Sequence, residues 1–149
     1  MTAERTEGAI AGAAVDPLVF TEVARLCAAY AEHLDACEWK GLAACFTEDC
    51  RFVGGLPPSE VHGRAAATEY LRSASGEFAV VHHVVSLPVL TAEGSACRGS
   101  SAFVGYHWHS AKADSGITMG GRYHDLFSIE DGAWKIAERT IEILWSKSA

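Results

Sequence analysis

Residues 16–46 read DPLVFTEVARLCAAYAEHLDACEWKGLAACF, and this stretch decides how the rest of the chain can fold. Asp16 followed by Pro17 predicts a helix start, because the aspartate can cap the first turn and proline has no N–H to leave unpaired there. At about 100° per residue, the apolar side chains of this helix share one arc and most charged ones lie opposite. The arc contains Phe20, Val23, Ala24, Cys27, Ala31 and Leu34. We therefore predict an amphipathic helix that buries one stripe.

Two polar residues border the apolar stripe of this helix, Tyr30 at one edge and Asp35 at the other. A carboxylate beside an apolar surface is unfavourable unless it is paired. Asp35 therefore either ends the helix or belongs to a functional site. The helix taken alone leaves both interpretations open.

The composition predicts one domain, residues 16–149, preceded by a flexible tail, residues 1–15. The tail is small and polar and lacks the basic start and apolar core of a signal peptide, so we expect a cytoplasmic protein. No apolar run is long enough to span a membrane. The net charge is −7 and the 12 basic residues are scattered, which leaves no basic face for nucleic acid. We expect no membrane partner and no nucleic-acid partner.

Downstream of the first helix, the pattern changes from helices to strands. A second helix at 38–46, a turn at 47–49, a short strand at 50–53 and a third helix at 64–73 are followed by strands at 80–90, 96–110, 117–129 and 133–145. Helices followed by sequential strands predict an α+β fold, a cone-shaped roll with three N-terminal helices packed on a curved, mostly antiparallel sheet. A cavity between the sheet and the helices would be the natural ligand site.

Strand alternation selects side chains that can face this cavity. On the last strand, Arg139 shares a face with Ile141 and Ile143, so we predict that it points inward. A buried arginine stays charged and needs an anion or strong acceptors. Tyr123 and Asp125 share a face of the preceding strand. Asp125 can therefore either pair with Arg139 or contact a ligand.

His82 and His83 are adjacent in a predicted strand, so only one of their rings can enter the cavity. A carboxylate that accepts from one ring nitrogen fixes the tautomer and raises the basicity of the other nitrogen, which makes Asp35 and one of these histidines a candidate base. His107 and His109 could form a metal pair, but no third ligand follows at a usual spacing. The chain also lacks nucleotide, phosphate and serine-hydrolase motifs. We expect no metal and no cofactor.

Short motifs along the chain resemble the SnoaL-like branch of the nuclear transport factor 2-like superfamily. They are Tyr30, Asp35 and Trp39 in the pattern Y-x4-D-x3-W, then LAACFTED, HHVVS, GRYHD and DGAWKIAER. The resemblance covers roughly residues 15–145 and implies the same cone-shaped roll. The superfamily includes scytalone dehydratase, hexachlorocyclohexane dehydrochlorinase and polyketide cyclases. It also includes non-catalytic carriers and small subunits of ring-hydroxylating dioxygenases.

The resemblance also implies which residues would form the site. Asp35 and His82 match the aspartate and histidine that the dehydratase and the dehydrochlorinase share. His82 is preferred to its neighbour because Ser86 then falls where relatives often carry a polar residue. Arg139 matches an arginine of the dehydrochlorinase and Tyr30 stands in place of its lysine. Near the dehydratase's second histidine lie Tyr106 and His107, one of which would face inward.

Together these observations predict a cofactor-independent lyase or isomerase, of dehydratase or cyclase type, acting on a hydrophobic, ring-containing natural-product intermediate. His82 would act as the base and Asp35 would orient it. Tyr30, Tyr123 and Arg139 would stabilise a developing oxyanion or leaving group. The further predicted substrate contacts are Tyr106, His107, Ala102, Val104, Asp125, Ile141 and Ile143. The alternative is a non-catalytic binding module or interaction subunit of the same fold.

We also expect a homo-oligomer, namely a dimer, with a trimer as the alternative. The helices cover only one side of the predicted sheet, so its convex face is exposed. Every second side chain of the strand at 96–110 would lie on that face. These side chains would then form an apolar or aromatic patch of one of two sets, either Phe103, His107 and His109 or Val104, Tyr106 and Trp108. A second copy is the commonest way to cover such a patch.

Overall fold

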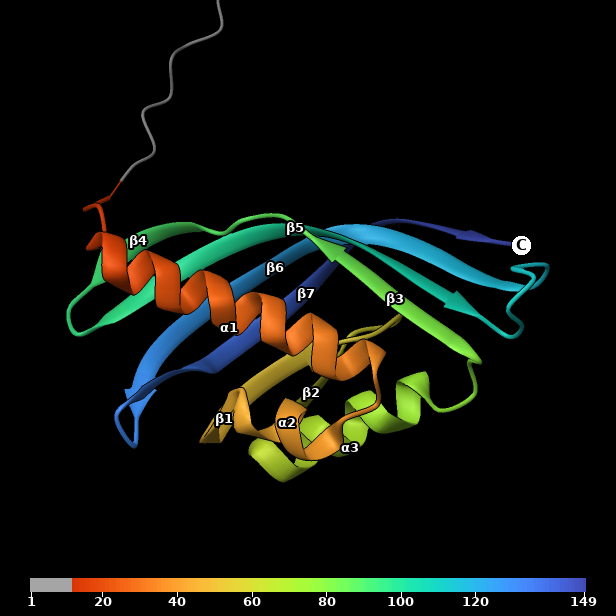
Figure 1. Ribbon diagram of the computed structural model, residues 1–149, viewed down its shortest axis with the longest axis horizontal. Helices are drawn as coiled ribbons and strands as arrows, with labels where there is room; N and C mark the ends of the chain where they lie inside the picture. The colour runs from red at the N-terminus through yellow and green to blue at the C-terminus, as the bar shows by residue number, and fades with distance from the viewer. Residues whose placement is uncertain (1–11) are drawn as a thin grey trace, which may run out of the picture.

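The chain folds into one curved sheet with three helices, an α+β fold as predicted. The computed structural model describes residues 12–149. Residues 1–11 of the predicted tail therefore lie outside the described residues. The elements are α1 (Pro17–Asp35), α2 (Trp39–Ala44), β1 (Phe46–Gly54), β2 (Ser59–His62), α3 (Arg64–Ser75), β3 (Val80–Val85), β4 (Val89–Glu93), β5 (Ala96–Trp108), β6 (Gly116–Glu130) and β7 (Ala133–Ser148). Figure 1 shows α1 lying along the sheet, with α2 and α3 gathered beside β1.

The strand order is β2-β1-β7-β6-β5-β3, and β4 also pairs with β5. All pairs are antiparallel except β1 and β7, which run parallel. The sheet is curved and open rather than closed, so the helices are needed to cover its inner face. None of the helices within residues 12–149 is long and apolar enough to cross a membrane.

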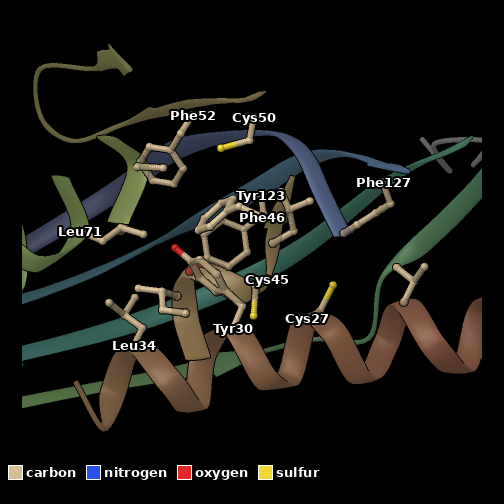
Figure 2. Packing of buried hydrophobic residues seen from close by; sticks show 14 of the residues in the cluster. Cys27, Tyr30, Leu34, Cys45, Phe46, Cys50, Phe52, Leu71, Tyr123 and Phe127 are labelled. Atoms are coloured by element: carbon tan, nitrogen blue, oxygen red, sulfur yellow. The ribbon is translucent and has the colours of Figure 1, made fainter. Parts of the chain in front are cut away.

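Helix α1 forms for the predicted reasons. The side chain of Asp16 accepts a hydrogen bond of 2.8 Å from the Leu18 N–H, and Pro17 is the first helical residue. Cys27, Tyr30 and Leu34 point from α1 toward the sheet and are buried (Figure 2). Tyr30, which the sequence placed at the edge of the stripe, is fully buried.

Strand β2 was not predicted, and two of the predicted segments are wrong. The strand expected at 80–90 is two strands, because the chain leaves β3 at Ser86 and Pro88, which has no N–H to donate to a ladder, precedes β4. The turn expected at 47–49 is part of β1. The pairing of β1 with β7 is irregular between Phe46 and Arg51, which is where these polar residues lie. There the Glu48 N–H donates a hydrogen bond to the Glu130 carboxylate rather than to β7.

Candidate functional site

A cavity of about 190 Å³ lies between the inner face of the sheet and helices α1 and α3. Its wall is almost entirely apolar, with a few tyrosine and histidine side chains. The lining residues are Tyr30, Leu34, Gly55, Leu56, Tyr70, Ala74, Phe78, His83, Phe103, His107, Ile117, Met119, Tyr123, Ile141 and Ile143. Enclosed apolar cavities with few polar groups are typical small-molecule sites.

One histidine of the cavity wall is paired with Asp35, which itself lies outside the lining, and this histidine is His83. Its Nδ1 lies 2.7 Å from Asp35 Oδ1, and its backbone N–H donates to Asp35 Oδ2 at 2.8 Å. Asp35 is the last residue of α1, and His83 lies on the edge strand β3. The carboxylate therefore holds both the ring and the backbone of one residue, and an ionised Asp35 fixes the ring proton on Nδ1. Nε2 is left as the nitrogen that Asp35 does not engage.

The prediction that His82 faces the cavity is wrong. The His82 side chain is 62% exposed, whereas that of His83 is 6% exposed. The reason lies in the pairing of β3 with β5, where His83 stands opposite Gly105. A Cβ at position 105 would lie 3.1 Å from His83 Nε2, a tight contact that Gly105 avoids because it has no side chain. The Asp35–histidine pair was predicted, but its histidine is one residue further along the strand.

A second imidazole, His107, meets His83 inside the cavity. The two rings make an edge-to-face contact with centroids 5.2 Å apart, and Phe78 packs on the other side of His107 at 5.2 Å. Burial, together with the neighbouring His83, lowers the pKa of His107 to about 4. His107 is therefore neutral near pH 7. Its buried Nδ1 has no hydrogen-bond partner among the described residues, so His107 can hydrogen-bond a ligand without changing its charge.

Tyr30 and Tyr123 lie deeper in the cavity wall, as predicted. Burial raises the pKa of Tyr30 to about 12 and raises that of Tyr123 well above its usual value. Both phenols are therefore protonated and able to donate. In the described part of the chain, the buried Tyr30 hydroxyl meets no hydrogen-bond partner.

Arg139 points inward, as predicted, but does not line the cavity. Its Nε and one terminal nitrogen each donate to a different oxygen of Asp125 at 2.8 Å, and both side chains are 1% exposed. The guanidinium also lies between the rings of Tyr30 and Tyr123, 4.2 Å from each centroid. Of the two alternatives for Asp125, pairing with Arg139 is therefore the one observed. The predicted direct contacts of Asp125 and Arg139 with substrate are wrong, since the pair sits behind the tyrosines.

The alternation of β5 resolves the choice between Tyr106 and His107 in favour of His107. Phe103 and His107 face the cavity, so Ala102, Val104 and Tyr106 lie on the outer face and do not form its wall. Ile141 and Ile143 line the cavity as predicted.

Several cavity residues were not predicted from the sequence. They are Leu34, Gly55, Leu56, Tyr70, Ala74, Phe78, Phe103, Ile117 and Met119. Met119 and Ile117 have the same parity as Tyr123 on β6, whose pairing with β5 is regular, so alternation along that strand could have identified both. Within residues 12–149, no group of three histidine, cysteine, aspartate or glutamate side chains is placed to hold a metal ion.

Comparison with known proteins agrees with this fold. A scytalone dehydratase, provisionally so named, from Novosphingobium aromaticivorans superposes with a TM-score of 0.78 at 23% identity over 89% of this chain and 88% of that one. The hexachlorocyclohexane dehydrochlorinase LinA-type3 from Novosphingobium barchaimii gives a TM-score of 0.76 at 12% identity over 89% of this chain and 90% of that one. Among curated protein sequences, none matches this chain. The family model for the SnoaL-like domain matches residues 19–140, and the chain therefore belongs to the SnoaL-like domain family.

Proposed function

We propose that this protein is a cofactor-independent lyase or isomerase, of dehydratase or cyclase type, in which His83 is the general base and Asp35 orients it. The observation that carries the proposal is the 2.7 Å contact between His83 Nδ1 and Asp35 Oδ1 at the wall of an apolar cavity. A base in such a place is shielded from water, and the carboxylate stabilises the imidazolium that forms. The dehydratase and dehydrochlorinase names among proteins of the same fold support this reaction class.

In the proposed reaction, His83 Nε2 takes a proton from a carbon next to a carbonyl group. The electron pair of the broken C–H bond moves toward the carbonyl oxygen, which becomes an enolate. His83 then returns the proton, either to another carbon of the substrate or to a hydroxyl that leaves as water. The base is thus regenerated in each cycle without a cofactor.

Protonated donors near the base would stabilise the enolate oxygen. The phenols of Tyr30 and Tyr123 and the neutral imidazole of His107 lie in the same wall. Preorganised donors in a dry site stabilise developing charge more than water does. The Tyr30 hydroxyl is suited to this role because it meets no hydrogen-bond partner among residues 12–149.

The proposed substrate is an uncharged, hydrophobic ring compound. No lysine or arginine is among the residues that line the cavity. Arg139, the nearest buried cation, is already engaged by Asp125. An anionic ligand would therefore lose its hydration without gaining a partner. The volume of about 190 Å³ is below the range of drug-sized sites, which favours a compound of one or two rings.

Exchange of carbon-bound hydrogen tests the proposal without the natural substrate. We expect the protein to exchange the C–H groups beside the carbonyl of 2-tetralone, a neutral two-ring ketone, in deuterated buffer faster than buffer alone, as followed by proton NMR. Asp35→Asn should lower the catalysed rate by roughly 10²-fold or more. The ring and the backbone N–H of His83 each contact a different oxygen of the Asp35 carboxylate, whereas an asparagine amide has only one acceptor oxygen.

Two ligands of matched size serve as controls. Neutral 2-naphthol should inhibit the exchange, and ionised 2-naphthoate should not do so at the same concentration. Binding of 2-tetralone with no exchange above background would favour the non-catalytic binding module. Equal exchange by wild type and Asp35→Asn would contradict the role given to the pair.

We further propose a homodimer formed through the outer face of the sheet. Residues that stand directly opposite one another in neighbouring strands share a face of the sheet. One such row crosses β3, β5, β6 and β7 on the outer face and consists of Val84, Val104, Gly120 and Trp145. Val84 is 55% and Trp145 48% exposed. Such an apolar row is a typical self-association surface.

Light scattering should therefore give twice the 15.9 kDa chain mass at micromolar concentration. Val104→Glu should shift the mass toward the monomer, because two copies would each bury an unpaired carboxylate. His124→Gln, on the exposed part of the same face, is the control and should keep the wild-type mass. A wild-type monomer would rule out this dimer.

A further inference from the structure

Asp35 contacts a second histidine on the outside of the cavity. His82 Nδ1 lies 3.4 Å from Asp35 Oδ2, while Oδ1 contacts the His83 ring at 2.7 Å. One carboxylate therefore connects a solvent-exposed imidazole with the buried one that lines the cavity. Adjacent strand residues point to opposite faces, and Asp35 reaches both rings because α1 ends at the edge of the sheet, beside β3.

In a single copy of the chain, the outer side of this connection is open to solvent. A surface groove there is lined by Ala28, Ala31, Glu32, Asp35, Ala36, His82, His83 and Val85. The groups that face His82 are Asp35 and Glu32 from α1, His83 from its own strand, and the ring of Tyr106 from β5, which stacks on it at 6.2 Å. Among residues 12–149, no lysine or arginine lines the groove. The His82 ring therefore lies in solvent, with Oδ2 of the Asp35 carboxylate 3.4 Å from its Nδ1.

We propose that His82 is a positioning residue that acts through Asp35 and weakens the cavity base when it is protonated. The inference rests on the proposed function, because it requires His83 to be the base. A neutral His82 leaves the charge of Asp35 to stabilise the imidazolium of His83. A protonated His82 shares that charge and repels the second imidazolium, so His83 becomes a poorer base. At a partly exposed site, this predicts a rate that is lower by roughly tenfold.

The pH profile of catalysed 2-tetralone exchange tests this role. In the wild type we expect the rate to fall on the acid side in two steps, the first when His82 gains a proton and the second when His83 does. Between the steps the rate should hold at roughly a tenth of its upper value. In His82→Gln the first step should be absent, and the variant should be faster than the wild type in the pH range of that intermediate plateau.

The matched control is His124→Gln. His124 lies on the same outer face and is 49% exposed, and its Nε2 lies 2.7 Å from Glu142 Oε2. It is thus an exposed histidine beside a carboxylate, as His82 is, but among the described residues Glu142 contacts no histidine of the cavity. Its profile should keep both steps. Raising the salt concentration should reduce the first step in the wild type, because the charge on His82 is exposed and therefore screened.

Identical pH profiles for the wild type and His82→Gln would overturn the inference. A His82→Gln rate that is lower than the wild-type rate by the same factor at every pH would also overturn it, because that result indicates a structural role. The proposed function fails separately, when His83→Gln exchanges 2-tetralone as fast as the wild type. An inactive His83→Gln with an unchanged His82→Gln profile would leave His83 as the base and remove only the role of His82.

Discussion

Replacement of His83 with glutamine should lower the catalysed exchange of 2-tetralone by roughly 10²–10⁴-fold, the range that general base catalysis usually supplies. Glutamine retains a polar side chain of similar length, but its amide does not accept a proton near neutral pH. The measurement is the rate per folded molecule, compared with buffer alone. His83 is the inward member of the histidine pair and the one whose ring contacts Asp35 at 2.7 Å.

The stability of this variant should change little. Asp35 Oδ2 keeps the backbone N–H of position 83, so the carboxylate retains a donor after the ring is lost. A thermal melt close to that of the wild type together with a large loss of exchange identifies a catalytic role. The opposite pattern, a much lower melting temperature with near-normal exchange per folded molecule, would mean that the pair is structural.

The choice between His82 and His83 shows what the sequence could and could not predict. Strand alternation establishes that the two rings face opposite ways, and the apolar stripe of α1 establishes a carboxylate at its end. Which ring faces inward depends on how β3 pairs with β5, where His83 stands opposite Gly105, 22 positions downstream. A single sequence does not reveal that pairing, and the polar residue at 86 favoured the wrong histidine.

The alternation of β5 was ambiguous for a different reason. Both of its faces are apolar, with Phe103 toward the cavity and Val104 toward the outer face. Alternation predicts burial only where one face is polar. The prediction of Ala102 and Val104 as cavity wall was wrong because the outer face carries its own apolar row. On β7 the inward assignment of Arg139 was correct, because its companions Ile141 and Ile143 alternate with glutamate and threonine.

The sequence predicted a loop at 54–58 that could cover the mouth of a pocket, but not which of its residues would line the cavity. Gly55 and Leu56 reach the cavity because the chain after β1 turns back to pair as β2, a strand that the sequence did not indicate. The exposed sequence of β2, SEVH, has no pattern of its own and is a strand only because it pairs with the edge of β1. Sites built partly from such connections need the tertiary structure.

Replacement of Arg139 with methionine should have the largest effect on stability. Burial by itself would lower the pKa of Arg139, but the charge and hydrogen bonds of Asp125 outweigh it and raise that pKa well above the usual value, so the guanidinium is charged in the folded protein. Methionine would leave the Asp125 carboxylate buried, 1% exposed and without its partner. Breaking a buried pair in this way costs about 3–5 kcal/mol, which corresponds to a melting temperature lower by roughly 6–20 °C for a chain of this length.

The double variant Asp125→Leu with Arg139→Met separates the net contribution of the pair from the penalty of an orphaned charge. Replacing both partners with apolar groups of similar size is often nearly neutral, so the double variant should melt well above Arg139→Met. A double variant as unstable as the single one would mean that Arg139 acts mainly through the rings of Tyr30 and Tyr123, which it contacts at 4.2 Å each. Because those rings form the cavity wall, exchange of 2-tetralone should then fall together with stability. Retained exchange in a stable double variant would show that the tyrosines keep their positions without the cation between them.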